Sequence, residues 1–365
     1  MHLRRQSPPG NLGGITTSGG NFVTYLLGRR QTLLAGAGVL AGSVRRASAA
    51  DTVRFGSVGG LTDAGVLLGT EYGYFTPAGF NVEHIRLPSA PALLTAIATG
   101  QLDVAGIAVT PGLFTASQRG IQLRIVGDKQ SVRPGFSATR LVVRTALHTG
   151  NEAETAKRLR GKIIAVSSKA AGIYMVVLRY LKSQGIGPHD VRFVELAYPS
   201  MVPALTSGAV DAAALLEPFL TKALQMNVAK QQNDLVAASD AASGESATTV
   251  PMVYSETFAR KHDLAQGFMN GYMRGVRMYN DAFAKGIDKE KVIAVLSRRA
   301  HLDAKVIRDG FPAGLDPNQH VGRKFLEDCQ TFFVQQHDMQ KPIDLGKVID
   351  ESFAQAAVAR LGKYS

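Results

Sequence analysis

Residues 81–107 read NVEHIRLPSAPALLTAIATGQLDVAGI, and residues 190–215 read DVRFVELAYPSMVPALTSGAVDAAAL. Both stretches pass from an alternating apolar and polar segment through Pro-Ser to an Ala/Leu-rich segment, a glycine and a short apolar run, which is typical of a repeated unit. The pattern predicts strand, helix and strand in each copy. Ser89 and Ser200 are the predicted helix N-caps, because a serine oxygen accepts from free first-turn amides. Gly100 and Gly208 are the predicted helix ends.

The likeness continues upstream of both copies. Residues 53–75 and residues 163–185 each hold a short apolar strand, a turn of small residues and an amphipathic helix. Each half is therefore predicted to be β-α-β-α-β, which gives a parallel sheet with right-handed crossovers and helices on both faces. A ligand of such a sheet binds outside the carboxyl ends of the strands. The predicted fold class is α/β, with two lobes that face one another across a cleft.

The first fifty residues are predicted to be an export signal. Arg29 and Arg30 precede a run of small apolar residues that is too short to span a bilayer, and residues 47–49 read ASA, a cleavage-type sequence. The paired arginines favour the twin-arginine route, with cleavage near Ala49 or Ala50 and a periplasmic mature protein. The leader holds six arginines and no acid, so its removal leaves 35 basic and 29 acidic residues, a net charge of +6 instead of +12. Because no stretch interleaves lysines with aromatics, nucleic acid is a poor partner.

The rest of the chain divides into two lobes in our interpretation. Lobe 1 is predicted to hold residues 51–145 and 248–365, including C-terminal helices, and lobe 2 to hold residues 146–247. Residues 128–139 are polar and predict a loop, while residues 250–254 predict the strand that returns to lobe 1. Two crossings between lobes predict a hinge. The aromatic residues that recur at helical spacing after residue 255 are predicted to be core, and the single cysteine, Cys329, to be a small buried apolar residue.

These segments resemble a known family. Residues 55–111, the segment GKIIAVSS and the segment SGAVDAAALLEPF are similar to the nitrate/sulfonate/taurine and thiamine-precursor (NMT1/THI5-like, SsuA/TauA-type) substrate-binding proteins of ABC importers, which have the type II periplasmic binding protein fold. The likeness covers residues 51–254 well and the C-terminal helices loosely. It implies a periplasmic protein that captures a small organic solute, sulfonate-, taurine-, nitrate- or pyrimidine-like, and delivers it to an ABC permease in the inner membrane. We expect a monomer without a cofactor or a metal.

The candidate ligand site lies in the turns at the carboxyl ends of the strands. The turn at residues 59–62 lets a ligand approach the backbone, and Thr62 is predicted to cap the next helix. The turn at residues 167–169 offers two hydroxyls and a lysine at a predicted helix start capped by Ser168, which suits a carboxylate, sulfonate or phosphate. The candidate ligand-binding residues are Gly60, Leu61, Thr62, Ser89, Thr110, Ser167, Ser168, Lys169, Tyr198 and Glu217.

Glu217 has two interpretations. A partly buried carboxylate needs a donor or a cation. If the ligand supplies it, the ligand carries an amine, a hydroxyl or a ring nitrogen; if the protein supplies it, Glu217 is architectural. The hypothesis that we carry forward is a solute with an acidic group at residues 167–169 and a donor at Glu217.

Two other function classes stay open beside import. An enzyme is not expected, because the sequence has no Gly-x-Ser-x-Gly elbow, no His-Glu-x-x-His and no phosphate loop. The THI5-like relatives that make the pyrimidine of thiamine carry a cysteine-rich motif that this chain lacks. A binding protein that serves a sensor or chemoreceptor cannot be separated from an importer component by sequence.

Overall fold

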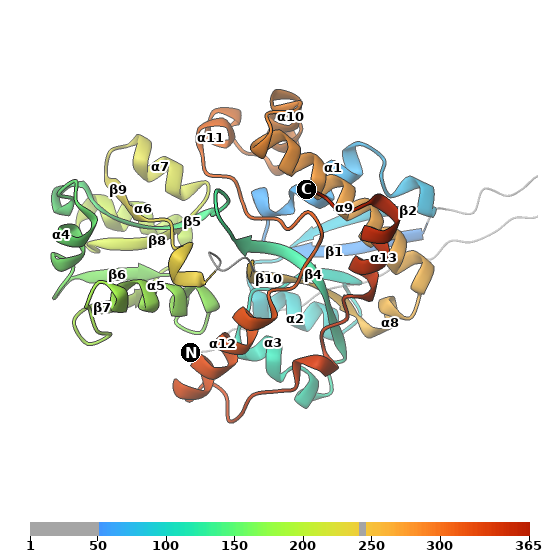
Figure 1. The fold of residues 1–365 in the computed structure, drawn as a ribbon, viewed down its shortest axis with the longest axis horizontal. Helices are drawn as coiled ribbons and strands as arrows, with labels where there is room; N and C mark the ends of the chain where they lie inside the picture. Colours follow the sequence, from blue (N-terminus) through green and yellow to red (C-terminus); the bar gives the residue numbers. More distant parts are fainter. Residues whose placement is uncertain (1–50, 241–245) are drawn as a thin grey trace, which may run out of the picture. The chain divides into compact units, whose positions relative to one another are not determined.

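The computed structural model describes residues 51–240 and 246–365, so the predicted leader lies outside the described residues. They form two five-stranded sheets, in the orders β2-β1-β3-β10-β4 and β7-β6-β8-β5-β9 (Figure 1). The strands are β1 Asp51–Ser57, β2 Phe80–Arg86, β3 Val104–Gly106, β4 Leu123–Val132, β5 Thr139–Arg144, β6 Ile163–Val166, β7 Arg192–Glu195, β8 Ala212–Leu216, β9 Ala229–Asn233 and β10 Ala247–Ser255.

Helices lie between most of the strands and make up the C-terminal part of the chain. None of the helices in the described ranges is long and apolar enough to cross a membrane. The α-helices are α1 Ala64–Glu71, α2 Ala90–Ala98, α3 Pro111–Thr115, α4 Glu152–Lys157, α5 Gly172–Ser183, α6 Tyr198–Ser207, α7 Phe219–Gln225, α8 Glu256–Ala259, α9 His262–Ala284, α10 Lys289–Ala300, α11 Ala304–Asp309, α12 Arg323–Gln335 and α13 Ser352–Leu361.

Both sheets are mixed rather than purely parallel. Strand β1 pairs in parallel with β2 and β3, and β6 pairs in parallel with β7 and β8, as predicted for β-α-β units. Strand β10 is antiparallel to β3 and β4, and β5 is antiparallel to β8 and β9. The prediction of parallel sheets is wrong at these two strands. Each of them enters its sheet from the other lobe, so no crossover helix within the sheet requires it to run parallel.

The prediction of a two-lobed α/β fold is confirmed, but the first crossing is displaced. Strand β5 pairs with β8 through Thr139↔Leu216 to Val143↔Ala212, so it belongs to the sheet of lobe 2. The chain therefore crosses in residues 133–138, before β5, and not between residues 145 and 146. The sequence pattern of a buried apolar strand is the same in either sheet, so the pattern alone does not show to which lobe β5 belongs. Strand β10 lies in the sheet of lobe 1, where the return strand is predicted.

The internal repeat is visible in single hydrogen bonds. The Asp103 carboxylate accepts from the backbone N–H of Arg54 on β1 at 2.9 Å, and the Asp211 carboxylate accepts from the N–H of Ile163 on β6 at 3.0 Å. Each aspartate therefore binds the neighbouring strand rather than an amide of its own turn. Asp103 also forms an ion pair with the Arg54 guanidinium at 2.9 Å, whereas Arg144 lies 3.9 Å from Asp211.

The predicted helix ends hold at three of four positions. Ser89 accepts from the N–H of Ala92 as the N-cap of α2, and Gly100 and Gly208 have left-handed φ angles of 71° and 78° where α2 and α6 end. Ser200 is not an N-cap, because α6 begins at Tyr198. Proline is favoured in the first turn of a helix, and Pro199 lies there, so the helix starts two residues before the predicted cap.

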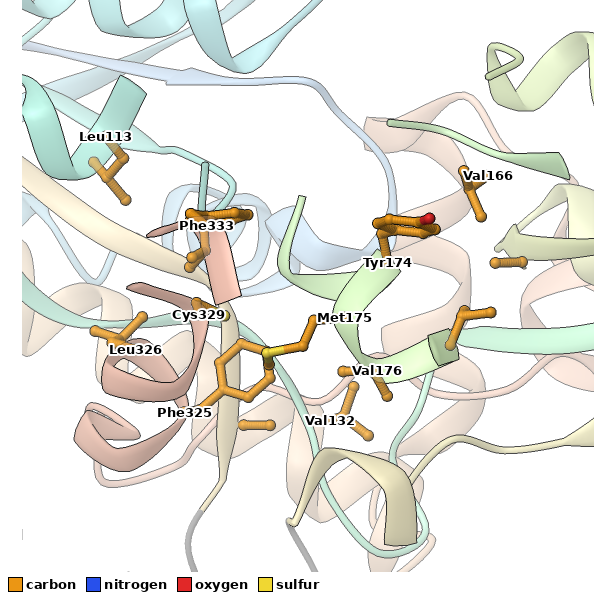
Figure 2. Packing of buried hydrophobic residues seen from close by; sticks show 14 of the residues in the cluster. Leu113, Val132, Val166, Tyr174, Met175, Val176, Phe325, Leu326, Cys329 and Phe333 are labelled. Atoms are coloured by element: carbon orange, nitrogen blue, oxygen red, sulfur yellow. The ribbon is translucent and has the colours of Figure 1, made fainter. Parts of the chain in front are cut away.

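The aromatic residues at helical spacing are core, as predicted. Phe268, Tyr272 and Tyr279 of α9 are fully buried, and they pack in one cluster with residues of β1 and β10. Cys329 of α12 is also fully buried, which confirms its predicted apolar role. Its cluster contains side chains from both lobes, such as Leu113 and Val166 (Figure 2).

Replacement of either repeat aspartate by alanine should destabilise the protein, because it leaves the amide of the neighbouring strand without its acceptor. We expect Asp103→Ala to lower the free energy of unfolding by about 1–3 kcal/mol. Asp211→Ala should cost less, since its arginine lies farther away. Urea denaturation of the mature chain measures both. Equal losses, or a larger loss for Asp211→Ala, would contradict this reading of the two ion pairs.

Candidate functional site

The turn after β1 has a backbone that only glycine adopts easily. Gly59 and Gly60 have φ angles of 91° and 97°, and Gly60 has a ψ of −169°. A Cβ atom on Gly60 would meet no heavy atom within 4 Å, so the turn faces open space. Within the described residues, the backbone N–H groups of Leu61 and Thr62 donate no hydrogen bond to the protein. Two free amides beside an open turn suit an acceptor group of a ligand.

Thr62 does not cap the following helix. The N-cap of α1 is Asp63, and the Thr62 hydroxyl instead accepts a hydrogen bond from the ammonium of Lys129. The side chain of Thr62 thus faces the interior, and the whole residue is 5% exposed. The predicted cap is wrong because a buried ammonium competes for the same oxygen.

A buried charge network holds this turn in place. Asp63 forms an ion pair with the ammonium of Lys129 at 2.8 Å and accepts a hydrogen bond from the Ser57 hydroxyl at 2.7 Å, and it lies 3.2 Å from Nε2 of His84. Because the Ser57 hydroxyl donates to Asp63, Nε2 of His84 carries the proton that Ser57 accepts at 2.8 Å. Burial alone would raise the pKa of the Asp63 carboxyl, but the ammonium of Lys129 and the His84 ring outweigh it and hold that pKa well below its usual range.

Lys129 lies where a loop is predicted. Strand β4 extends to Val132, so this segment is a strand that pairs with β10 on both sides of Lys129, with a register shift at the lysine itself. The lysine is 1% exposed, and its stem passes against Gly106, where a Cβ atom would lie 2.7 Å from the lysine Cδ. The neighbouring Asp128 is buried as well, and burial raises its pKa to about 7. Polar residue types indicated exposure here, and long-range pairing overrides that indication.

Ser89 and Thr110 border the same ends of lobe 1. Both hydroxyl oxygens cap helices: Ser89 accepts from the N–H of Ala92, and Thr110 accepts from the N–H of Leu113, each at 3.4 Å. Their oxygens are occupied in part, but each hydroxyl hydrogen is still available as a donor. Both side chains are half-buried. These two residues remain candidate ligand contacts.

In the corresponding turn of lobe 2, the backbone amides already donate to acceptors of the protein. Helix α5 begins at Gly172 and not at Ser168, whose hydroxyl accepts from the N–H of Ala170 at 3.1 Å. The N–H of Lys169 donates to the carboxylate of Glu195, and the N–H of Gly172 donates to the carbonyl of Val109 in lobe 1 at 3.2 Å. The predicted helix start at residues 167–169 is therefore wrong, because two protein acceptors already use the amides of this turn.

Two further predicted residues, Lys169 and Tyr198, have side chains that are not fully buried. The Lys169 side chain is exposed and forms no ion pair with any described residue. Tyr198 forms a hydrogen bond with Ser167, and burial raises the pKa of its phenol. The Tyr198 ring stacks with Phe219, with centroids 6.5 Å apart and planes 9° apart. Both rings are half-buried and lie at the starts of α6 and α7, which follow strands β7 and β8.

Glu217 is fully engaged within the protein. Its carboxylate accepts from the Thr221 hydroxyl at 2.7 Å, from the Thr221 N–H at 3.1 Å and from the Phe311 N–H at 2.9 Å. Burial raises the pKa of the carboxyl despite these donors. The charge of Arg140, whose guanidinium stacks over the Phe311 ring at 3.7 Å, lowers this pKa in part. These contacts fit the architectural interpretation, and a contact between Glu217 and a ligand stays a prediction.

The larger surface cavities lie away from this site. Five cavities in the described part of the chain have volumes of about 330 to 740 Å³, and none is lined by any of the ten candidate residues. The largest of these five borders Arg54 and Asp103, at the opposite end of the sheet. We place the site at the carboxyl ends of the strands, because ligands of open α/β sheets bind there.

Comparison with known proteins identifies the family. The model of the NMT1/THI5-like family matches residues 62–282, which is more than half of the chain and includes parts of both lobes. The protein belongs to the NMT1/THI5-like family. No curated protein matches the chain.

Solved structures share the fold of this NMT1/THI5-like protein. The periplasmic aliphatic sulphonate binding protein SsuA from Escherichia coli is 20% identical, with 83% of this chain and 92% of that chain covered and a TM-score of 0.65. The periplasmic nitrate-binding protein NrtA from Synechocystis PCC 6803 is 14% identical, with 86% and 89% covered and a TM-score of 0.66. The desulfurization enzyme DSZB is 16% identical, with 85% and 99% covered and a TM-score of 0.59. At these identities the likeness shows the fold alone.

Loss of the ammonium that supports the first turn should be costly. Lys129→Met leaves the Asp63 carboxylate buried without its cation, and breaking one side of a buried pair costs about 3–5 kcal/mol of folding free energy. The double variant Lys129→Met with Asp63→Asn removes the charge as well and should recover a large part of that loss. Urea denaturation at pH 7 measures both proteins. A double variant that is no more stable than the single one would contradict the pairing.

Proposed function

We propose that this protein is a periplasmic solute-binding protein that captures a small organic anion between its two lobes and delivers it to an ABC importer in the inner membrane. Membership of the NMT1/THI5-like family supports the class of function. The single observation that carries the choice of an anion is the open turn after β1, with its two free amides and a buried ammonium behind it. The ten candidate residues are the contacts that we propose, with unequal roles.

The two lobes differ in what they offer a ligand. The amides of the lobe 2 turn already serve Glu195 and Val109, whereas the amides of Leu61 and Thr62 serve no protein acceptor in the described residues. We therefore place the acidic group of the ligand at lobe 1. This reverses the orientation expected from sequence, in which residues 167–169 hold the acid.

The body of the ligand would lie against lobe 2. The stacked rings of Tyr198 and Phe219 offer an apolar, planar surface. The exposed ammonium of Lys169 offers a second positive charge two residues after Ser167, the hydrogen-bond partner of Tyr198. Such a surface favours a solute with an apolar part over a bare inorganic anion. A sulfonate or carboxylate with an alkyl or aromatic body fits both lobes better than nitrate does.

An enzyme is a weaker candidate. The cluster of Ser57, His84 and Asp63 has the residue types of a hydrolase triad, but the serine and the aspartate approach the same ring nitrogen, and Ser57 is fully buried. A triad needs the carboxylate on the other nitrogen and an accessible hydroxyl. Burial also raises the pKa of the Cys329 thiol well above its usual range, which disfavours a nucleophilic thiolate. These contacts support binding rather than catalysis.

The ligand-bound protein has two alternative partners, an ABC permease or a sensor. A sensor or chemoreceptor would use the same two-lobed capture as a permease. Genes for a permease and an ATPase beside the gene for this chain would favour import, and a receptor gene in their place would favour sensing. We propose a monomer that binds a small molecule and neither a cofactor nor nucleic acid.

A thermal-shift screen of the mature chain tests the ligand class. The probes are butanesulfonate, taurine, benzoate, nitrate and an aminopyrimidine. A ligand at a hundred times its dissociation constant stabilises the native state by about 2.7 kcal/mol, so a true ligand raises the melting temperature measurably. We expect an organic sulfonate or carboxylate to give the largest shift. Stabilisation by the aminopyrimidine alone would contradict an anionic ligand.

Two glycine variants test the site with similar backbone strain. Gly60 has φ 97° and ψ −169°, Gly362 has φ 79° and ψ 161°, and a Cβ atom on either would meet no heavy atom within 4 Å. Only Gly60 lies in the proposed site. We expect Gly60→Ala to weaken the best probe at least tenfold, about 1.4 kcal/mol, and Gly362→Ala to change its affinity less than twofold. Calorimetric titration measures both, and equal affinities for the two variants would contradict the proposed site.

A further inference from the structure

Helix α12 is anchored on lobe 1. The N–H of Gly322, just before the helix, donates to the Thr248 hydroxyl of β10 at 2.9 Å, and a Cβ atom on Gly322 would collide with the carbonyl of Ser246. Farther along, the ring of Phe333 packs against that of Phe114 of α3, with centroids 6.2 Å apart. Both partners belong to lobe 1, so the helix is fixed to that lobe at both ends.

The other side of α12 packs against α5 of lobe 2. A Cβ atom on Gly172, the first residue of α5, would lie 3.0 Å from the sulfur of Cys329 and 3.3 Å from the ring of Phe325. Figure 2 shows Met175 of α5 reaching toward Phe325 within the same buried cluster. At the rim, Arg179 of α5 forms an ion pair with Asp328 of α12 at 3.0 Å. We call this set the α5–α12 contact.

Beside the α5–α12 contact, one backbone hydrogen bond joins the two lobes directly. The N–H of Gly172 donates to the carbonyl of Val109, at the carboxyl end of β3. Phe325 is 4% exposed, and Met175 is 3% exposed. If the lobes separated at this point, these apolar side chains would enter water and the Gly172 amide would lose its acceptor. Both effects oppose separation.

We propose that α12 is a clasp that keeps lobe 2 against lobe 1 in the ligand-free protein, so that the two inter-lobe crossings do not act as a freely opening hinge. This goes beyond the proposed solute binding and does not depend on it. The clasp limits how far the cleft can open, and it keeps the turn of lobe 2 close to that of lobe 1 before a ligand arrives. Motion on ligand exchange is then confined to the parts of the cleft that α12 does not touch.

The native cysteine offers a direct test. In a disulfide, each sulfur lies about 3 Å from the Cβ of the other cysteine, which is the separation between Cys329 Sγ and the Cβ position of residue 172. Gly172→Cys should therefore form a disulfide with Cys329 in the folded, ligand-free mature chain, and a thiol assay should fall from two thiols to none on mild oxidation. Gly172→Ser is the matched control without the second thiol.

Small-angle scattering of the same ligand-free proteins gives the decisive comparison. We expect the oxidised Gly172→Cys protein and the wild type to have the same radius of gyration. Phe325→Ala should have a larger radius, whereas Phe353→Ala, an equally buried residue of the other large cluster, should not. Thermal unfolding establishes that each variant is folded at the measuring temperature. A locked protein more compact than the wild type, or no expansion in Phe325→Ala, would overturn the clasp.

Discussion

The buried pair of Lys129 and Asp63 is the interaction on which the candidate site depends. An ammonium and a carboxylate removed from water need one another, because either alone would be strongly unfavourable in the interior. The pair joins the middle of β4 to the first turn of lobe 1, and Ser57 and His84 complete the set of donors around the carboxylate. With those side chains held inward, the backbone of residues 60–62 is the part of the turn that remains for a ligand.

The two lobes have the same architecture, but the groups that they offer to a ligand differ. Asp103 and Asp211 perform the same structural role in each half, which is what a repeated unit predicts. The turns that face the cleft have diverged. In lobe 1 the turn is open and its amides are free, whereas in lobe 2 Glu195 and Val109 bind the equivalent groups. We therefore propose that a ligand meets backbone donors on one side and the rings of Tyr198 and Phe219 on the other.

Local signals in the sequence predicted the elements, and distant contacts decided the site. Ser89, Gly100 and Gly208 lie at the predicted helix ends because neighbouring residues alone determine the helix ends at these three positions. The sequence predicts a polar loop at Lys129, because its partner Asp63 is far away in the sequence and only the topology of the sheet brings the two together. The start of α5 differs from the prediction for a similar reason, since the acceptors of the amides before and at its start come from β7 and from lobe 1.

Hydrogen exchange of the mature chain, with and without the probe that stabilises it most, tests the central claim that one ligand contacts both lobes. Slower exchange of a bound amide reports the loss of local opening. The account predicts slower exchange both at residues 60–62 of lobe 1 and around Tyr198 of lobe 2 with the same probe. Protection confined to one lobe, or to a surface away from the strand ends, would contradict it.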